Sequence, residues 1–544
     1  MTAATCSAIV KKRTGAEPPI AGRPRPPGPL VSSPRRLMRA IIVLALGLGV
    51  AGAVAARAAD VDETGKAIHV LDRLAYGPAP GDIERVRKIG ARAYIDAQLH
   101  PERMALPENL RAELAALDTL RLDPVELFKE YGPPQARRGE KPDPQAIKAA
   151  RERARVISQQ AAQARLLRAI ESPRQLEEVM VDFWFNHFNV FAAKGLDHLW
   201  TGAYEEQAIR PYALGRFRDL LGATAHHPAM LFYLDNWQNT APQSRGARGK
   251  LQGLNENYAR ELMELHTLGV DGGYTQNDVI ALARIFTGWG LGGPRRRGSK
   301  GGFYFDAKRH DNDDKIFLGQ TIRASGAAEG ERALDLLARH PATARHIGFK
   351  LAQYFVADNP PPALVERLAR RFTETDGDIR AVLASLFESA EFWDPRYQGN
   401  KFKTPYHYAV SSVRAAGAKV NNIRPLAGWL LQQGMPLYGC LTPNGYKDTE
   451  EAWLNPDAMT RRINLATALA SGRLPLAQSA DFNVARADTA MAAVTPADAP
   501  PLDWKAVAHT LGGRFSPQTR AAIDAAPERL RAALILGSPE FMRR

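Results

Sequence analysis

Residues 82–99 read DIERVRKIGARAYIDAQL, and this stretch carries the pattern that decides the fold class. Its larger apolar side chains recur mainly at steps of three and four residues, which places them on one face of an α-helix. These side chains are Ile83, Val86, Ile89, Tyr94, Ile95 and Leu99. Because the same periodicity runs through almost the whole chain from Thr64 onwards, the sequence predicts an all-α protein. We expect a multi-helix globular domain with long loops and little or no β-structure.

The periodicity also predicts where the later helices lie. They cover 156–171, 174–188, 206–221, 255–268, 275–287, 331–339, 342–356, 361–373, 378–389, 404–416, 456–471, 505–512 and 517–537. The best strand candidate is the short stretch 301–305. Residues 131–155, which are rich in Pro and charge, and residues 478–502, which are rich in Ala, Asp and Pro, are predicted to be exposed insertions or linkers.

The beginning of the chain has the three parts of a secretory signal peptide. A basic stretch around Arg35, Arg36 and Arg39 precedes a mostly apolar run, which ends in an Ala-x-Ala exit at Ala58. We therefore predict a disordered or spurious extension over 1–37, a signal peptide over 38–58 cleaved after Ala58, and a single helical domain over 59–544. The mature protein would be periplasmic or secreted. The alternative is a retained membrane anchor, but glycines and alanines make the run weakly hydrophobic, so we expect no stable membrane insertion after cleavage.

Charge and cysteine content exclude several classes of protein. The net charge is +14, but residues 1–58 hold nine Lys and Arg and one acid, which leaves a net charge of +6 for the rest. General phosphate binding needs a concentrated basic face, so the sequence predicts no nucleic-acid partner. Cys6 and Cys440 are too few for a disulfide framework or a Cys-rich zinc site.

The densest group of chemistry-bearing residues lies in 255–269, NENYARELMELHTLG. At about 100° per residue, one helix face carries Asn257, Arg260, Glu261 and Glu264. Two carboxylates one turn apart beside an arginine can transfer protons or bind a cation. The structural alternative is that Arg260 forms ordinary i,i+4 pairs with Glu256 and Glu264 on a solvated helix.

Neighbouring segments place further polar and aromatic residues where they could join this face. They supply His187, Asp235 and Asp311 as candidate catalytic residues, and Asn186, Arg284, His310, Trp184, Trp237 and Trp289 as candidate binding residues. Thr275 and Asp278 form an approximate capping box at the start of the helix that carries Arg284. The acidic loop 306–315 fails the EF-hand pattern, because Lys315 stands where an oxygen ligand is needed. A divalent metal stays open as a cofactor.

Familiar catalytic motifs are absent from the sequence. There is no H-E-x-x-H, no G-x-x-x-x-G-K-[ST], no G-x-S-x-G and no G-x-G-x-x-G that opens a helix. This counts against zincin proteases, P-loop enzymes, serine hydrolases of the elbow type and dinucleotide enzymes.

The chain resembles the domain of unknown function 1800 family in many short stretches, in order, over nearly all of 65–544. They are HVLDRLAYG at 69–77, FNHF at 185–188, residues 255–269, GY at 273–274, TGW at 287–289, HD at 310–311 with Lys315, FKTP at 402–405, PNGY at 443–446, WL at 453–454 and Arg461. The resemblance implies an exported, mostly helical bacterial protein of unsettled activity. The family often has an acid shortly after the Lys-x-Pro element, where this chain has Tyr406 and His407. Members are often encoded beside a sulfatase-like family, which implies a sulfatase-like protein as a partner.

Two functional hypotheses follow. In the first, the protein is a periplasmic hydrolase of a polysaccharide or similar polar polymer. Its catalytic residues are Glu261, Glu264, His187, Asp235 and Asp311, and its substrate contacts are Asn186, Asn257, Arg260, Arg284, Trp184, Trp237, Trp289 and His310. In the second, it is a non-catalytic helical scaffold or partner of an exported sulfatase-like enzyme, and the polar residues form a buried network. A metal-dependent oxidoreductase is a third alternative.

The spatial arrangement of these residues separates the two main hypotheses. An open cleft lined by the predicted residues favours an enzyme, and a sealed network favours a scaffold. Buried charges need partners, so we expect Glu261 or Glu264 within hydrogen-bond reach of Arg284, His187 or Arg260, in or beside the principal concavity.

Overall fold

The stretch 82–99 folds as two short helices, α2 (Asp82–Ile89) and α3 (Ala91–Leu99), that meet at Gly90. The backbone φ of Gly90 is 87°, a conformation that glycine adopts without a steric penalty. Because the chain turns here, Ile89 is 46% exposed, whereas the other apolar residues of the stretch are buried. The computed structural model describes residues 63–134, 143–249, 251–293, 301–478 and 499–544. The predicted extension over 1–37 and the predicted signal peptide lie outside these described residues.

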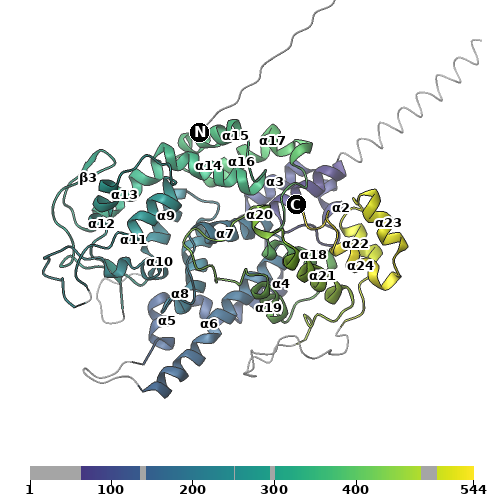
Figure 1. The fold of residues 1–544 in the computed structure, drawn as a ribbon, viewed down its shortest axis with the longest axis horizontal. Helices are drawn as coiled ribbons and strands as arrows, with labels where there is room; N and C mark the ends of the chain where they lie inside the picture. Colours follow the sequence, from purple (N-terminus) through teal and green to yellow (C-terminus); the bar gives the residue numbers. More distant parts are fainter. Residues whose placement is uncertain (1–62, 135–142, 250, 294–300, 479–498) are drawn as a thin grey trace, which may run out of the picture. The chain divides into compact units, whose positions relative to one another are not determined.

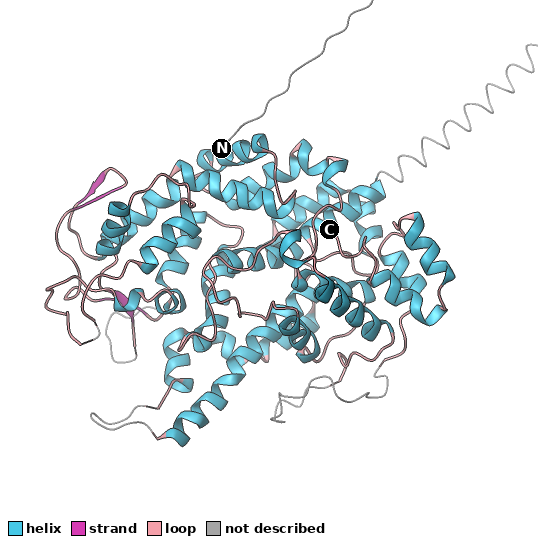
Figure 2. Ribbon diagram, in the orientation of Figure 1, coloured by secondary structure: helices cyan, strands magenta, loops and turns pink. Residues whose placement is uncertain are grey.

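Helices make up most of the described chain, and Figure 2 shows how little of it is strand. The N-terminal half holds α4 (Glu108–Ala115), α5 (Pro124–Tyr131), α6 (Pro144–Glu171), α7 (Gln175–His187), α8 (Asp197–Tyr204), α9 (Phe217–His226), α10 (Pro228–Tyr233), α11 (Asn257–Glu261) and α12 (Gln276–Ile285). Two π-helical segments, Glu205–Ile209 and Leu262–Thr267, extend α8 and α11.

The later part of the chain is also helical. It holds α13 (Ala327–Arg339), α14 (Pro341–Phe355), α15 (Pro362–Glu374), α16 (Ile379–Glu388), α17 (Ala390–Trp393), α18 (Pro405–Ala416), α19 (Arg424–Gln432), α20 (Glu450–Trp453), α21 (Pro456–Ala470), α22 (Trp504–Thr510), α23 (Pro517–Ala525) and α24 (Glu528–Leu536). The described residues from Glu63 onwards belong to one compact unit. Among the helices that the structure describes, none has the length and apolar character needed to cross a membrane.

The strands form two small antiparallel pairs. β1 (Trp289–Leu291) pairs with β2 (Phe303–Phe305), and β3 (Lys315–Phe317) pairs with β4 (Gln320–Ile322). β2 lies in the stretch that the sequence offered as its best strand candidate. The prediction of a mostly helical fold with little β-structure is therefore confirmed.

Three helix predictions differ from the structure in their bounds. Residues 144–155 belong to α6 instead of an insertion, because Asp143 caps the helix and Pro144 fits its first turn. The single helix predicted over 206–221 is divided, since Pro211 and Gly215 lie between the π-helical segment and α9. Pro527 likewise separates α23 from α24, where one helix was predicted.

One hydrophobic core runs through the described helices, and α7 is among its most buried elements. In Figure 1 α7 lies near the middle of the drawn helices. Trp184 of α7 is fully buried, and its indole Nε1 donates a hydrogen bond of 2.9 Å to the carbonyl of Ala213. The polar side chains of this helix are therefore set in an apolar surrounding, which makes their partners decisive for the functional site.

Candidate functional site

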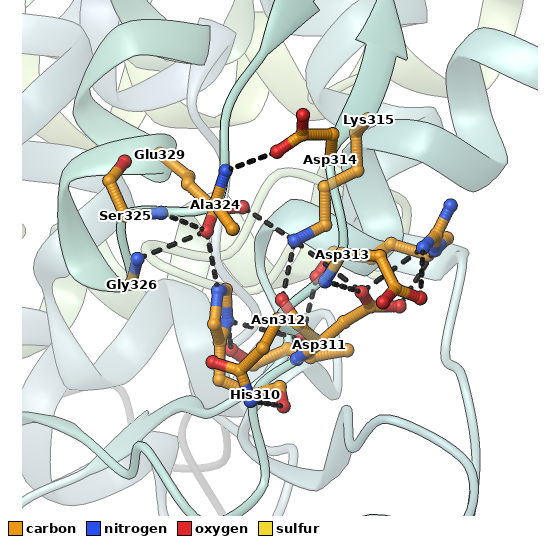
Figure 3. A network of polar contacts seen from close by, with 12 residues as sticks. His310, Asp311, Asn312, Asp313, Asp314, Lys315, Ala324, Ser325, Gly326 and Glu329 are labelled. Carbon is orange, nitrogen blue, oxygen red and sulfur yellow. Dashed lines mark hydrogen bonds and ion pairs between the residues drawn. The ribbon is translucent and has the colours of Figure 1, made fainter.

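Three of the predicted site residues meet two others beside α13 (Figure 3). Arg284 of α12 donates from Nε and Nη2 to the two carboxylate oxygens of Asp311, at 2.7 and 3.1 Å. The His310 Nε2 atom lies 3.0 Å from Glu329 Oε1, and Lys315 Nζ donates to Glu329 Oε2 at 2.6 Å. We call these five residues, Arg284, His310, Asp311, Lys315 and Glu329, the Glu329 network.

The charges of the Glu329 network are paired, and its inner residues His310, Lys315 and Glu329 are buried. Glu329 also accepts hydrogen bonds from the backbone amides of Ser325 and Gly326, at 2.8 and 3.0 Å. The side chains of Lys315 and Glu329 are both 0% exposed. The hydrogen bonds that Glu329 accepts outweigh its burial and lower its pKa. A fully satisfied buried network of this kind holds elements together, here the β3–β4 hairpin against α13, and leaves no group for a ligand.

The face of α11 that the sequence singled out is separate from this network. Arg260 donates to Glu256 at 3.1 Å and to Gln276 at 3.0 Å. Glu264 accepts a long hydrogen bond of 3.5 Å from the Tyr274 hydroxyl. Burial and the neighbouring Glu264 raise the pKa of Glu261. Among the described residues, neither Glu261 nor Glu264 forms an ion pair.

The contacts expected for Glu261 and Glu264 are therefore not made. Arg260 is held by Glu256, one helical turn before it, and Arg284 by the Glu329 network. At the 100° per residue of an α-helix, Glu264 would lie on the same face as Arg260. The π-helical segment from Leu262 onwards has a wider turn, which shifts Glu264 away from this face.

Asp235 and Asn257 are fixed by local contacts. Lys194 donates to Asp235 Oδ2 at 2.8 Å, and it also bonds the carbonyl of Tyr233. Asn257 donates from Nδ2 to the carbonyl of Leu234 at 3.2 Å. The contacts of both side chains therefore hold the short segment at the end of α10, and neither side chain contacts the Glu329 network.

Of the three tryptophans predicted as stacking surfaces for a ligand, Trp184 and Trp289 are buried inside the protein and Trp237 is half-buried against Phe232. Trp184 and Trp289 are both 0% exposed. Trp289 stacks on His226, with the ring centroids 4.6 Å apart. Trp237 stacks on Phe232 at 5.8 Å. This packing has a simple physical cause, since such large apolar rings contribute most to stability when they are removed from water.

Two other predicted residues, Asn186 and His187, line a cavity of about 60 Å³ beside α7. We call it the α7 cavity. Its walls come from α6, α7, α14, the start of α18 and the loop 435–448, and its polar residues include Arg165, Asp182, Asn186, His187, Lys350, Tyr406 and Asp448. A polar space of this size holds a few waters or one small polar group.

Arg165 and Asp182 form one wall of the α7 cavity. Arg165 of α6 donates to Asp182 Oδ1 at 2.5 Å and to Glu205 Oε2 at 2.8 Å. Its guanidinium lies 5.0 to 5.3 Å from the ring centroids of Phe185, Tyr406 and Tyr438. Burial raises the pKa of Asp182 in spite of the attraction to Arg165. The carboxyl of Asp182 is thus held in place by Arg165, with a pKa above its usual range.

A second layer of buried ion pairs supports this wall. The π-helical segment Glu205–Ile209 turns both Glu205 and Glu206 towards arginines. Arg210 binds both oxygens of Glu178, at 2.8 and 3.0 Å, and lies 3.7 Å from Glu205. Buried carboxylates of this kind persist only when they are paired, and each one here has an arginine.

Lys350 of α14 lies on another wall of the same cavity. In the described part of the chain its amine has no hydrogen bond and no ion pair. Burial lowers the pKa of Lys350, and the nearby charge of Lys401 lowers it further. Asp448, the nearest acid, is already engaged by Lys401 at 3.2 Å and by Arg544 at 3.4 Å. The amine of Lys350 is therefore left for a ligand.

Three histidines lie behind the cavity. The ring centroid of His187 is 6.1 Å from that of His266 and 6.0 Å from that of His346. His187 and His346 donate hydrogen bonds to the carbonyls of His266 and Leu265, at 3.1 and 3.2 Å. Burial lowers the pKa of His346 to about 4 and that of His266 to about 3, so both rings are neutral. Within the described residues, no group of three or more His, Cys, Asp or Glu side chains is placed to hold a metal ion.

Asn186 closes the cavity on the side of the loop 435–448. Its side-chain amide donates to the carbonyl of Tyr446 at 2.8 Å and accepts from the amide of Tyr446 at 2.7 Å. The preceding residue, Gly445, has a φ of 69°, and a Cβ atom there would lie 2.1 Å from the carbonyl oxygen of Asn186. Asn186, predicted to contact substrate, thus fastens the cavity wall.

Sequence reasoning missed Arg165, Asp182 and Lys350. One signal was available for Asp182, because it lies four residues before Asn186 and so on the same helix face, within the aromatic run of α7. Arg165 and Lys350 belong to other helices, and their approach to α7 is a property of the tertiary fold.

Comparison with known proteins identifies a family. The model of the family described as "Protein of unknown function (DUF1800)" matches residues 69–543. No curated protein and no solved structure matches this chain.

Proposed function

The chain belongs to the DUF1800 family, and we propose that it is an exported hydrolase of a polysaccharide or similar polar polymer. Its site is the α7 cavity, with Asp182 as the general acid and Lys350 as the general base. The observation that carries this proposal is that Lys350 has no partner among the described residues, in a polar cavity where Arg165, Asp182 and Asp448 are all paired.

The two groups suit opposite roles in hydrolysis. Burial raises the pKa of Asp182 and lowers the pKa of Lys350, which are the directions that suit a carboxyl to act as a general acid and an amine to act as a general base. Asp182 would protonate the leaving oxygen of the polymer, and Lys350 would take a proton from the attacking water. Such proton transfers contribute typically about 10²–10⁴-fold each.

The cavity is small enough to take one linkage or one substituent of a longer chain. Polar side chains at its rim, among them Gln353 and Lys447, would contact the rest of the polymer. This is the reason for preferring a polymer over a bulky apolar substrate.

Export is part of this proposal and rests on the sequence. Protein recovered from the periplasm is expected to begin at Ala59, after the Ala-x-Ala exit. N-terminal sequencing tests this, and a start near Met1 or Met38 would contradict it.

The activity is tested by screening the purified protein against glycan and ester substrates, with metal analysis of the same sample. Asp182→Asn and Lys350→Met are expected to abolish turnover. Turnover that survives both substitutions would refute the assignment of the site.

The second candidate is a non-catalytic scaffold or partner of a sulfatase-like enzyme. The paired Glu329 network favours it, because that network takes up Asp311, which was predicted to be catalytic, and Arg284 and His310, which were predicted to bind substrate. Copurification with a sulfatase-like protein, together with no turnover in the screen, would select this alternative.

A further inference from the structure

A second polar cavity, of about 80 Å³, lies at the segment FKTP that the sequence comparison singled out. We call it the Lys403 cavity. Its polar and aromatic lining consists of Asp72, Lys403, Arg514, Glu540, Phe541 and Arg543. None of these residues lines the α7 cavity.

Lys403 is the buried group of this cavity. The residue is 2% exposed, and its Nζ atom lies 3.9 Å from the centroid of the Phe541 ring. Its backbone amide donates to Met542 at 2.9 Å, and its carbonyl accepts from Arg462 at 2.7 Å, so its position is fixed. In the part of the chain that the structure describes, the ammonium group has no hydrogen bond and no ion pair.

The other charged side chains of the cavity differ in whether they form hydrogen bonds or ion pairs. Arg543 binds Glu450 at 2.5 and 3.0 Å, and Glu540 accepts from Ser516 and Thr519. Asp72 and the exposed Arg514 form no ion pair or hydrogen bond within the described ranges. Two cations without an ion pair, Lys403 and Arg514, therefore face the cavity together with two carboxyls, Asp72 and Glu540, and the partners of Glu540 are neutral.

Two buried arginines next to lining residues turn this balance into an excess of positive charge, since Arg462 bonds the carbonyl of Lys403 and Arg73 follows Asp72 in the chain. Arg73 and Arg462 are both 0% exposed. In each guanidinium, Nε and Nη1 have no partner among the described residues. Unpaired buried charge of one sign is costly, and a bound anion would relieve it.

We propose that the Lys403 cavity binds one small oxyanion, either a free sulfate or phosphate or the carboxylate of a small organic acid. Lys403 would hold the anion from inside and Arg514 from the rim. The volume matches one such group, and the charge excess supplies the attraction. Asp72 stands on the same cavity wall and opposes the anion, so the structure predicts opposite effects for substitutions at Lys403 and Asp72.

Isothermal titration of the purified full protein with sulfate, phosphate and succinate, at constant ionic strength in chloride, tests this proposal. Saturable binding of one anion per chain is expected for at least one of the three, and the tightest identifies the class. Lys403→Met should weaken binding at least tenfold. Arg514→Gln should weaken it several-fold, and Asp72→Asn should strengthen it.

Lys505→Met is the matched control. The Lys505 ammonium also lies over an aromatic ring, 5.8 Å from the centroid of Trp504, but on the surface and outside the cavity. Its loss should leave binding unchanged. If Lys403→Met does not fold, the exposed Arg514 and the carboxyl of Asp72 still decide the question. No saturable binding of any of the three anions, or a weaker affinity in Asp72→Asn, would overturn the proposal.

Discussion

The Glu329 network and the α7 cavity both hold charged side chains largely away from water, and they differ in whether a charged group is left without a partner. In the network, Glu329 accepts from Lys315, from the ring of His310 and from two backbone amides. In the cavity, Arg165 and Asp182 are paired as closely, but Lys350 is not. Complete pairing marks a structural role, and an unpaired charge beside an open volume marks a site for a ligand. Five predictions test this distinction, from the largest expected effect to the smallest.

Removing the charge of Glu329 from the Glu329 network should have the largest effect on stability. Glu329→Gln removes the closest counter-charge of the buried Lys315 and leaves it only Asp311, 3.5 Å away, so the free energy of unfolding should fall by about 3–5 kcal/mol. Denaturant unfolding measures this. The matched control is Glu366→Gln, which removes a partly exposed pair with Arg345 and should change the stability by about 1 kcal/mol or less. Equal effects of the two substitutions would contradict the structural role of the network.

Substitutions of two lysines, Lys350 and Lys401, give the most direct test that the α7 cavity is the active site. Lys350→Met should reduce turnover by about 10²–10⁴-fold and leave stability within about 1 kcal/mol of wild type, because it removes a charge that has no partner. Lys350 is half-buried, whereas Lys401 is fully buried and pairs with Asp358 at 2.5 Å and with Asp448 at 3.2 Å. Lys401→Met should therefore destabilise by about 3–5 kcal/mol. A comparable loss of stability in Lys350→Met would show that Lys350 is structural.

The two regions should also respond to acid in different pH windows. The folded pKa of His346, about 4, lies below the unfolded value of about 6.5. Protons then bind more readily to the unfolded chain, so stability is complete above pH 6.5 and declines as the pH falls towards 4. Between pH 7 and pH 5 this amounts to about 1–2 kcal/mol for one such ring. His346→Gln should lose less stability over that interval than wild type does.

The Glu329 network should respond only at lower pH. The pKa of Glu329 is lowered in the folded state, so its contribution is present above the unfolded value of about 4.3 and is lost as the pH falls below it. The stability difference between wild type and Glu329→Gln should therefore stay constant from pH 7 to pH 5 and shrink below pH 4. A difference that shrinks already at pH 6 would contradict this assignment.

The smallest effect is expected at Glu261, the residue that the sequence favoured as acid or base. Glu261 is half-buried and has no ion pair among the described residues, so Glu261→Gln should change the stability by about 0.5 kcal/mol or less. It should also leave turnover unchanged, because Glu261 lines neither the α7 cavity nor the Lys403 cavity. A large loss of turnover would return the active site to α11.

The helices were predictable because their signal is local. Apolar spacing located most of them, and the capping box of Thr275 and Asp278 forms as predicted. Bounds were missed where a single residue decided them, such as Pro527. The partners of charged residues were not predictable, since periodicity tells which face of a helix is buried but not which other face it meets. Arg284 was expected as a partner of Glu261 or Glu264, and it binds Asp311, 27 residues away.

The same limit explains which residues of the candidate site were predicted from the sequence and which were missed. Asn186 and His187 were found because an aromatic run made them conspicuous, and they do line the cavity. Lys350 and Arg165 are ordinary residues of long helices, and nothing in their local sequence distinguishes them from solvated ones.

The bonds between Asn186 and Tyr446 determine how a ligand is received. They join the loop 435–448 to α7 in the manner of paired strands, and Gly445 permits the close approach because it has no side chain. The cavity wall is thus assembled before any ligand arrives. Little conformational entropy is lost on binding to such a preorganised wall, so affinity depends on fit and charge instead of on the ordering of a loop.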